Sequence, residues 1–376
     1  MGSLEIRPVH STGDLRRFIR LPFKLYRDEP NWVAPLIFER KQFLDRRKNP
    51  FFEHGRAEYF LALRDGRPVG RITAQVDDNF QRFQENKWGW FGFFECERDP
   101  AAARALLDRA EQWLRGQNCD RMVGPADFTT NDECGLLTEG HERTPLILSP
   151  WTHRYYPELL EGAGMAKAMD LLMWELHISG RDRVNPVIWK LADQLEERHG
   201  ILVRPFRKRD LEAEVARFIE IYHSAWEKNW GFVPLTESEV RHYASQLKPF
   251  LDENWAYVAE KDGETVGAAL TLPDYNQVLL HLRGRILPFG WAKFLWYRRK
   301  IDRVRVFALG VKPEWQHTGI AARFYQCHFD AAETTPQKYG EMGWILEVNK
   351  SMNSAMEALG GKVVRRFRLY ERDLGG

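Results

Sequence analysis

A repeated hairpin pattern divides this chain of 376 residues into two copies. The first copy reads Phe60-x-Ala62-x-x-Asp65-Gly66-x-x-Val69-Gly70, and the second reads Tyr257-x-Ala259-x-x-Asp262-Gly263-x-x-Val266-Gly267. Every matching position is displaced by the same interval, 262 − 65 = 197 residues. An Asp-Gly pair between two apolar stretches predicts a two-residue hairpin turn in each copy. The length also suits two ordinary domains, so a duplicated domain is the simplest explanation.

The elements expected around the two hairpins occur in the same order. In copy one a strand at 4–9 and helices near 13–27 and 37–47 come first, and a strand at 88–97 and a helix at 101–115 follow. The counterparts in copy two are 201–206, 210–228, 237–251, 304–311 and 319–332. Each copy reads β-α-α-β-β-β-α-β, which is the order of an α/β domain. We predict domains 1–180 and 185–376, with a helix at 186–198 between them.

A strand, a turn and a helix in copy two form a candidate anion site. The strand Phe307–Val311 runs into Pro313, then into Gln316-His317-Thr318-Gly319-Ile320-Ala321, and a helix follows. Small residues at Gly319 and Ala321 let the backbone approach a ligand. The first N–H groups of a helix have no intrahelical partner and attract phosphate or pyrophosphate. The stretch is neither a Walker loop nor a dinucleotide fingerprint. An ordinary strand–turn–helix is the alternative.

This loop resembles the Gln/Arg-x-x-Gly-x-Gly/Ala loop of the GNAT N-acyltransferase superfamily, and the element order resembles the GNAT topology. The resemblance implies two tandem GNAT-like domains, each a mixed central sheet flanked by helices. It also implies an acyl-CoA co-substrate (acetyl-CoA or longer), with no metal. Strand residues such as Leu309 and Val311 would hold the pantetheine arm, and Asn353 fits the outline of a later family motif. The loop residues implied to grip the pyrophosphate are Gln316, His317, Thr318, Gly319, Ile320 and Ala321.

Copy one departs from this pattern at the equivalent loop, which reads Cys96-Glu97-Arg98-Asp99-Pro100-Ala101. Pro100 is a good first helical residue, and Asp99 is a good N-cap whose carboxylate satisfies the free N–H groups. Glu97 and Asp99 would also repel a pyrophosphate. We therefore predict that 1–180 is a degenerate copy and that the acyl-CoA site lies in 185–376.

Three residues near the end of the chain are candidates for the chemistry. Glu347, expected on a strand at 344–349, is a candidate general base, and Asn349 is expected on the same face. The family often places a tyrosine acid four residues before a glycine that corresponds to Gly360, but Met356 stands there and cannot donate a proton. Tyr370 is a candidate substitute. A solvated carboxylate at Glu347 and a structural role for Tyr370 are the alternatives.

The segment 287–300 combines apolar and basic residues. Leu287, Trp291, Phe294 and Leu295 fall at helical spacing, and Lys293, Arg298, Arg299 and Lys300 cluster beside them. This is the composition of an interfacial helix, so we predict peripheral contact with an anionic membrane. A helix that covers the sheet and ends in solvated basic residues is the alternative.

Composition limits the cellular compartments and the binding partners that we expect for the chain. There are 55 Lys and Arg against 53 Asp and Glu, so the net charge of +2 makes no case for nucleic acid. The four cysteines lack a C-x-x-C spacing, which favours buried thiols in a reducing compartment. The N-terminus has no apolar signal core, and no apolar run reaches the length of a membrane span. We expect a cytoplasmic protein, peripheral to the inner face of the membrane through 287–300.

The chain also resembles bacterial tandem-GNAT proteins at Val123-Gly124-Pro125, Leu136-Leu137-x-x-Gly140 and Leu369-Tyr370-Glu371-Arg372. Some of these relatives N-acylate long-chain amines, including sphingoid bases. The resemblance implies an N-acyltransferase of lipid metabolism that acts on a primary amine. The alternatives are an acetyltransferase of a small polar amine or a protein N-terminus, and a non-catalytic CoA-binding or structural protein.

Overall fold

The computed structural model describes residues 2–375 and separates them into two compact units. Unit 1 contains the chain up to Leu171, the segment Leu279–Phe294 and the chain from Arg365 onward. Unit 2 contains Leu172–Val278 and Leu295–Val364. The units therefore cross the predicted boundary between 1–180 and 185–376. That division remains a prediction about the two sequence copies.

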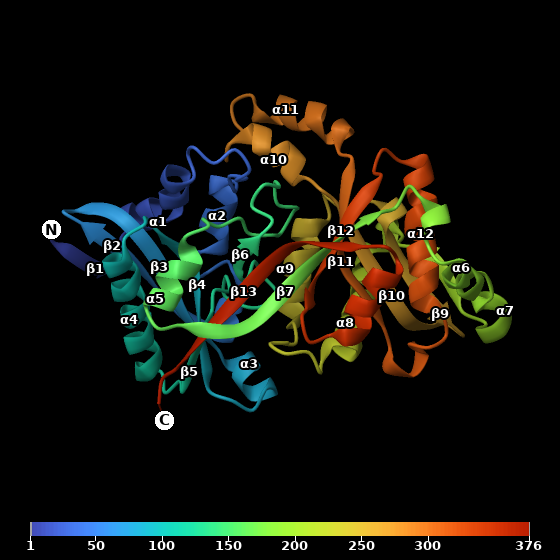
Figure 1. The fold of residues 1–376 in the computed structure, drawn as a ribbon, viewed down its shortest axis with the longest axis horizontal. Coiled ribbons are helices and arrows are strands. Elements are labelled where there is room, and N and C mark those ends of the chain that lie inside the picture. The colour runs from blue at the N-terminus through green and yellow to red at the C-terminus, as the bar shows by residue number, and fades with distance from the viewer. Residues whose placement is uncertain (1, 376) are drawn as a thin grey trace. The chain divides into compact units, whose positions relative to one another are not determined.

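Unit 1 is a mixed sheet with helices on both faces (Figure 1). The sheet order is β1-β2-β3-β4-β5-β13, with β6 also paired to β13, and only the β4–β5 pair is parallel. Gly70 faces Leu106 of α4, whereas the neighbouring Arg71 bonds to Phe18 of α1, so these helices cover opposite faces. The strands are β1 Leu4–Pro8, β2 Gly55–Arg64, β3 Arg67–Asp77, β4 Trp88–Cys96, β5 Arg121–Gly124, β6 Leu136–Glu139 and β13 Lys362–Asp373; the helices are α1 Thr12–Leu25, α2 Ile37–Phe43, α3 Asp78–Phe83, α4 Pro100–Gly116 and α5 Tyr156–Gly162.

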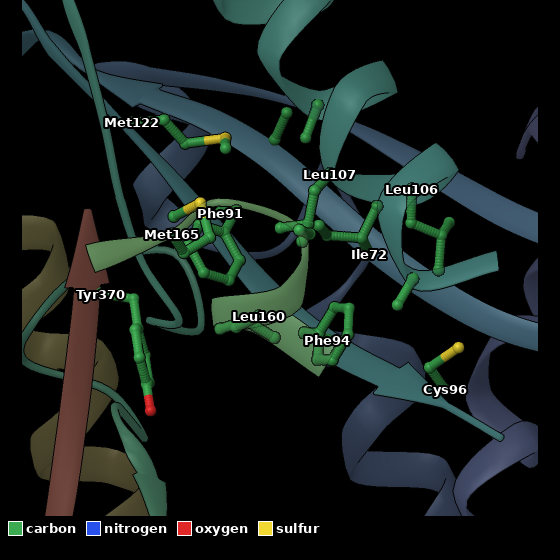
Figure 2. Close-up of a cluster of buried hydrophobic side chains, with 14 of the residues drawn as sticks. Ile72, Phe91, Phe94, Cys96, Leu106, Leu107, Met122, Leu160, Met165 and Tyr370 are labelled. Carbon is green, nitrogen blue, oxygen red and sulfur yellow. The ribbon is translucent and has the colours of Figure 1, made fainter. Parts of the chain in front are cut away.

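The main core of unit 1 lies between the sheet and helices α4 and α5. Figure 2 shows Phe91 and Phe94 of β4 facing Leu106 and Leu107 of α4, with Tyr370 of β13 at the edge of the cluster. All five side chains are buried. The last strand of the chain thus completes the core that the first copy begins.

Unit 2 repeats this plan around the sheet order β7-β12-β11-β10-β9-β8, in which β11 and β12 are parallel. Gly310 faces α8 and the neighbouring Val311 packs with Ile320 of α12, so these two helices cover opposite faces. The strands are β7 Ala166–His177, whose second half belongs to this unit, β8 Leu202–Pro205, β9 Ala256–Lys261, β10 Glu264–Pro273, β11 Arg303–Val311 and β12 Tyr339–Leu346; the helices are α6 Pro186–Asp193, α7 Leu195–His199, α8 Leu211–Trp226, α9 Glu237–Leu247, α12 Ile320–Thr334 and α13 Lys350–Ala358.

The two hairpins are built alike, which confirms the repeat. Both turns have positive φ at both central residues: 50° and 77° at Asp65 and Gly66, and 50° and 86° at Asp262 and Gly263. This is the geometry that favours Asp-Gly in a two-residue hairpin. In each hairpin the strand register also skips one residue, Val69 in β3 and Val266 in β10. These bulged positions are again 266 − 69 = 197 residues apart.

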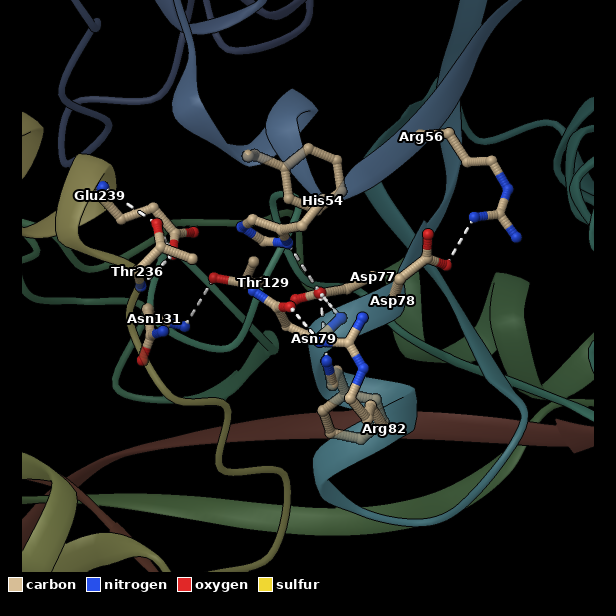
Figure 3. Close-up of polar contacts among 12 residues, drawn as sticks. His54, Arg56, Asp77, Asp78, Asn79, Arg82, Thr129, Asn131, Thr236 and Glu239 are labelled. Carbon is tan, nitrogen blue, oxygen red and sulfur yellow. Dashed lines mark hydrogen bonds and ion pairs between the residues drawn. The ribbon is translucent and has the colours of Figure 1, made fainter.

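Polar side chains fix the ends of elements in each unit, as Figure 3 shows. In unit 1 Asp77 caps α3 and lies 3.0 Å from Nδ1 of His54, and Arg56 pairs with Asp78 at 2.6 Å. In unit 2 Thr236 and Glu239 form a reciprocal capping box at the start of α9. The Asp77 cap and the capping box satisfy N–H groups that a helix start would otherwise leave free.

Candidate functional site

Strands β11 and β12 of unit 2 pair at one end and separate at the other. Their parallel register runs from Arg303 opposite Tyr339 to Val306 opposite Met342 and stops there, although β11 continues to Val311 and β12 to Leu346. The register between β10 and β11 also passes over Phe307, a bulge at the same point. Phe307, Ala308 and Leu309 are all partly exposed. An edge of β11 is therefore available to an extended ligand beside this opening.

A buried arginine lies where the two strands part. Arg305 of β11 is 2% exposed, and its Nε and Nη2 donate to the carbonyl oxygen of Gly343 at 3.3 and 3.2 Å. Gly343 directly follows the last paired residue of β12. The guanidinium thus satisfies a carbonyl beyond the end of the ladder and helps to keep the opening formed. The sequence signal that could have found it is an arginine within an otherwise apolar strand.

The loop after β11 has the backbone geometry of an anion site. Gly319 is the N-cap of α12 with φ of 101°, and no side chain caps the helix. The first N–H groups of α12 are therefore left to a ligand or solvent, at the positive end of the helix dipole. A Cβ at Gly319 would lie 3.1 Å from the carbonyl oxygen of Leu191 in α6. Both the φ value and this close contact explain why glycine is required here.

The other loop residues shape the approach to α12. The Thr318 hydroxyl donates to Trp315 O at 2.7 Å, and the Gln316 amide donates to Val311 O at 3.4 Å. His317 is exposed, and Ile320 is fully buried in the core. The structure thus brings together Leu309, Val311 and the loop on β11 and α12. Which of these atoms contact a ligand remains a prediction.

The opposite face of β11 is closed by α8. The ring of Trp226 would come within 2.5 Å of a Cβ at Gly310, and Ile221 would come within 3.0 Å. Gly310 therefore lets an aromatic ring approach the backbone of the strand that borders the opening. A glycine inside a strand is the sequence signal for such a close approach.

The end of β12 differs from the expected strand at 344–349. The strand ends at Leu346, Glu347 and Val348 form a turn, and Asn349 is the N-cap of α13. The expectation that Glu347 and Asn349 share a strand face is therefore wrong, because Asn349 uses its side chain to accept from Met352 N at 3.1 Å. Glu347 is half-buried at this turn.

Asn353 and Met356 both serve the packing of α13. The Asn353 amide donates to Leu346 O at 3.0 Å and accepts from Trp174 Nε1 at 2.9 Å, so it holds the β12 end against β7. Met356 is fully buried. The residue that stands in place of the family's usual acid is thus part of the core.

Tyr370 lies in unit 1, whereas Glu347 and Asn349 lie in unit 2. Tyr370 is fully buried, and its hydroxyl donates to Glu161 Oε1 at 3.0 Å. Burial and the neighbouring Glu161 carboxylate raise the pKa of the Tyr370 hydroxyl above its ordinary value. These contacts favour the structural alternative for Tyr370.

The equivalent opening in unit 1 is already filled. Strands β4 and β5 pair only as far as Trp90 opposite Val123. Beyond that point Cys96 N donates to the Tyr156 hydroxyl at 3.2 Å, and the Tyr155 hydroxyl donates to Cys96 O at 2.8 Å. Side chains at the start of α5 therefore take backbone groups of β4 that an extended ligand would need.

Asp99 blocks the helix start in the same unit. Its carboxylate accepts from Ala101 N and Ala102 N, both at 3.1 Å, as the sequence predicts. Arg64 pairs with Asp99 at 2.5 Å, and Arg67 pairs with Glu97 at 2.7 Å. The repulsion argument is therefore weaker than expected, since the charges are paired. Occupied N–H groups remain the stronger reason to expect no pyrophosphate here.

The segment 287–300 contains helix α11, Gly290–Tyr297, none of whose residues is buried. Leu287 and Phe289 are each 75% exposed, Trp296 is 63% exposed and Trp291 is 54% exposed. Lys293, Arg298, Arg299 and Lys300 are exposed as well. The alternative that this helix covers the sheet therefore lacks the buried face it needs. Within residues 2–375, no helix combines the length and apolar character needed to cross a bilayer.

A mixed sheet with helices on both faces occurs in each unit, and unit 2 adds the opening beside a bulged strand and the glycine-capped helix. Together these features define a tandem GNAT fold. Comparison with solved structures agrees. A tandem GNAT protein from the clavulanic acid biosynthesis pathway superposes with a TM-score of 0.60 at 13% identity, covering 100% of this chain and 99% of that one. A GCN5-related N-acetyltransferase from Sphaerobacter thermophilus gives 0.53 at 14% identity, covering 99% and 96%. These two solved structures show that the chain has the GNAT fold.

Curated relatives identify the family. The chain is 36% identical to bacterial ceramide synthase of Caulobacter vibrioides, covering 99% of this chain and 98% of that protein. It is 35% identical to protein YghO of Escherichia coli, covering 98% and 95%. The chain belongs to the family that these two proteins represent. No protein-family profile matches it.

Proposed function

We propose that unit 2 binds a long-chain acyl-CoA and transfers its acyl group to a long-chain, sphingoid-type amine. The observation that carries the binding site is Gly319: its left-handed φ and the absence of a side-chain cap leave the first turn of α12 to the pyrophosphate. The partly exposed edge at Phe307–Leu309 then suits the pantetheine arm, which can bond to it as an added strand. The relative named bacterial ceramide synthase supports the lipid acceptor.

The reaction needs a neutral amine and a polarised thioester. The neutral amine nitrogen attacks the thioester carbonyl carbon and loses one of its two protons to solvent as the amide forms. The C–S bond breaks, and CoA leaves as a thiolate that takes a proton from solvent. A free alkyl ammonium has a pKa of about 10.4, so a base must remove its proton at neutral pH. Glu347, half-buried at the turn after β12, is the proposed base. Backbone N–H groups of β11 near Val311 are the proposed donors to the developing oxyanion.

The other predicted residues have supporting roles in this proposal. Asn349 and Asn353 hold α13 and the end of β12, so they position Glu347 rather than contact the reacting atoms. Gln316, His317, Thr318, Ile320 and Ala321 shape the cradle around Gly319. Tyr370 is no longer proposed as the acid, because it belongs to the core of unit 1.

A long-chain substrate must be taken from a membrane, and we assign that contact to 287–300. An apolar helix with no buried residue, beside four exposed basic side chains, has the composition of an interfacial anchor. The protein would then act in the cytoplasm, peripheral to the inner face of the membrane. An acetyltransferase of a small polar amine remains the alternative function.

Three measurements test this proposal. Free thiol release should be faster with palmitoyl-CoA than with acetyl-CoA when a long-chain amine is the acceptor; the reverse preference with polar amines would favour the alternative. Calorimetry should show that Gly319→Asp loses acyl-CoA binding, while Gly319→Asn, which adds similar bulk without charge, loses less. Hydrogen exchange on adding CoA should slow amides at 311–322 and leave those at 97–105 unchanged. Equal binding by wild type and Gly319→Asp would overturn the site.

A further inference from the structure

Helix α6 lies directly beside the cradle, which the sequence did not indicate. Around the Cβ position of Gly319, the nearest atoms are the carbonyl oxygen of Leu191 at 3.1 Å and the Cβ of Leu191 at 3.6 Å. Figure 1 shows α6 next to α12, in the segment between the two sequence copies. A ligand phosphate held on Gly319 would therefore have the Leu191 side chain as a neighbour.

One face of α6 is anchored to α12. Trp189 packs on Phe329 with ring centroids 5.1 Å apart, and Asp193 accepts from the Gln326 amide at 2.7 Å. Ala192 is buried between them. These contacts make α6 a fixed wall of the site. The Asp193 carboxylate is thus bonded to a residue of α12. The side-chain oxygen of Gln326 accepts a hydrogen bond from Arg323, which lies one turn inside α12.

The other face of α6 is exposed and carries an unusual combination of residues. Val187, Lys190 and Leu191 are at positions i, i+3 and i+4, so they share one face. Val187 is 59% exposed and Leu191 is 43% exposed. Lys190 is also exposed, and none of residues 2–375 forms an ion pair with it. Two aliphatic side chains and a free cation beside a phosphate cradle are complementary to a nucleotide.

We propose that this face of α6 binds the adenosine 3′-phosphate end of CoA: the adenine lies on Val187 and Leu191, and Lys190 pairs with the 3′-phosphate. The inference rests on the proposed acyl-CoA site, since Gly319 must first hold the pyrophosphate. It adds a second recognition element, contributed by the segment between the copies. An exposed aliphatic pair then has a partner, and the lysine charge has a counter-ion.

The test compares CoA with 3′-dephospho-CoA by calorimetry on the full chain. The wild type should bind CoA about tenfold more tightly than 3′-dephospho-CoA, as a charge-assisted contact implies. Lys190→Met should lose that factor for CoA and leave 3′-dephospho-CoA affinity unchanged. Val187→Ser with Leu191→Ser should weaken both ligands. Lys248→Met, which changes an exposed lysine of α9's end, is the matched control and should change neither.

The outcomes separate this inference from the function on which it rests. Strong and equal binding of CoA and 3′-dephospho-CoA by the wild type, or an unchanged CoA affinity in Lys190→Met, would overturn the α6 site and leave the acyl-CoA site standing. A wild type that binds neither ligand would overturn both. Thermal unfolding of each variant, measured without ligand, checks that the exposed substitutions leave the fold intact.

Discussion

Glu347 lies at the turn between β12 and α13. Its proposed role as the general base can be tested by substitution. Glu347→Gln keeps the shape of the side chain but cannot accept the amine proton. Turnover should fall by roughly 10²–10⁴-fold at neutral pH, and the loss should shrink as pH rises because more amine is already neutral. The measurement is a pH profile of thiol release. Glu357→Gln, on the exposed side of the adjoining α13, is the control and should have the turnover of the wild type. Wild-type turnover in Glu347→Gln would leave positioning or water as the explanation.

His328 of α12 provides a prediction about stability. It is buried, its Nδ1 lies 2.6 Å from Phe324 O and its Nε2 lies 2.7 Å from the Thr271 hydroxyl. Burial lowers the pKa of His328 from 6.5 to about 4. The unfolded chain therefore binds more protons between pH 4 and 6.5, so stability present above pH 6.5 is lost as pH falls toward 4, by up to about 3 kcal/mol.

Urea unfolding at about pH 5 and about pH 7.5 checks this linkage. Buried His141, whose pKa is also lowered to about 4, contributes a slope of the same sign. His328→Gln should therefore be less stable at neutral pH and should lose part, but not all, of the wild-type pH dependence. An identical pH dependence in wild type and variant would show that His328 is protonated equally in both states.

Residue-level expectations succeeded where a short local pattern decides the geometry. The Asp-Gly turns, the Asp99 cap and the glycine at the start of α12 each depend on a few neighbouring residues. The prediction that Glu347 and Asn349 share a strand face is wrong because Asn349 caps helix α13 with its side chain. The mostly apolar residues at 344–348 favour a strand and do not indicate this cap. The role of Arg305 was missed, since its partner Gly343 is distant in sequence.

At the scale of elements, α11 gives a prediction about membrane contact. Its apolar side chains should enter an anionic bilayer while Lys293, Arg298, Arg299 and Lys300 meet the headgroups. Each basic side chain contributes about 1 kcal/mol near such a surface, and salt weakens the attraction. The wild type should therefore float with anionic vesicles at low salt. Trp291→Glu with Trp296→Glu should stay in solution and lose turnover on long-chain amines more than on short ones.

The control for α11 carries the same change in charge elsewhere. Phe38→Glu with Leu202→Glu replaces two apolar side chains that are 53% and 54% exposed in α2 and β8. That variant should still float. A wild type that ignores vesicles, together with an unchanged ratio of long- to short-chain turnover in the α11 variant, would remove the membrane contact and favour the polar-amine alternative.

The order of the elements could be predicted from the sequence because helices and strands have different hydrophobic periods. The ends of the helices and the elements that they contact were harder to predict. The expected helix at 186–198 is two helices, α6 and α7, that meet at Gln194. The prediction that copy one is degenerate follows from Asp99 in the sequence. The contribution of α5 does not, because Tyr155 and Tyr156 reach β4 from some 60 residues away.

At the scale of the whole molecule, the repeat predicted two copies but not how the compact units share the chain. β13 ends the second copy, yet from Arg365 onward it belongs to unit 1, where Tyr370 to Asp373 pair with β5. β7 ends the first copy, yet from Leu172 it belongs to unit 2. Each exchanged strand pairs with residues that are distant in the sequence, so the exchange cannot be predicted from any one segment.

This exchange predicts what removal of the C-terminal strand does. A chain that ends at Val364 loses Phe367, Leu369, Tyr370 and Leu374, each at most 1% exposed in unit 1. It also loses Arg365, which donates to Arg143 O and Thr144 O at 3.0 and 2.8 Å. Removing even one buried aromatic side chain costs about 3–5 kcal/mol, so unit 1 should lose its cooperative fold.

Hydrogen exchange reads out the two units separately in that shortened chain. Amides of β4 and β5 in unit 1 should exchange much faster than in the full chain, while those of β10 and α12 in unit 2 should be affected least. Tyr370→Phe, which removes only the hydroxyl bonded to Glu161, is the mild control and should leave both patterns close to wild type. Faster exchange confined to unit 2 would mean that the last strand stabilises the copy that encodes it, and that a division of the chain near residue 180 describes the folding units after all.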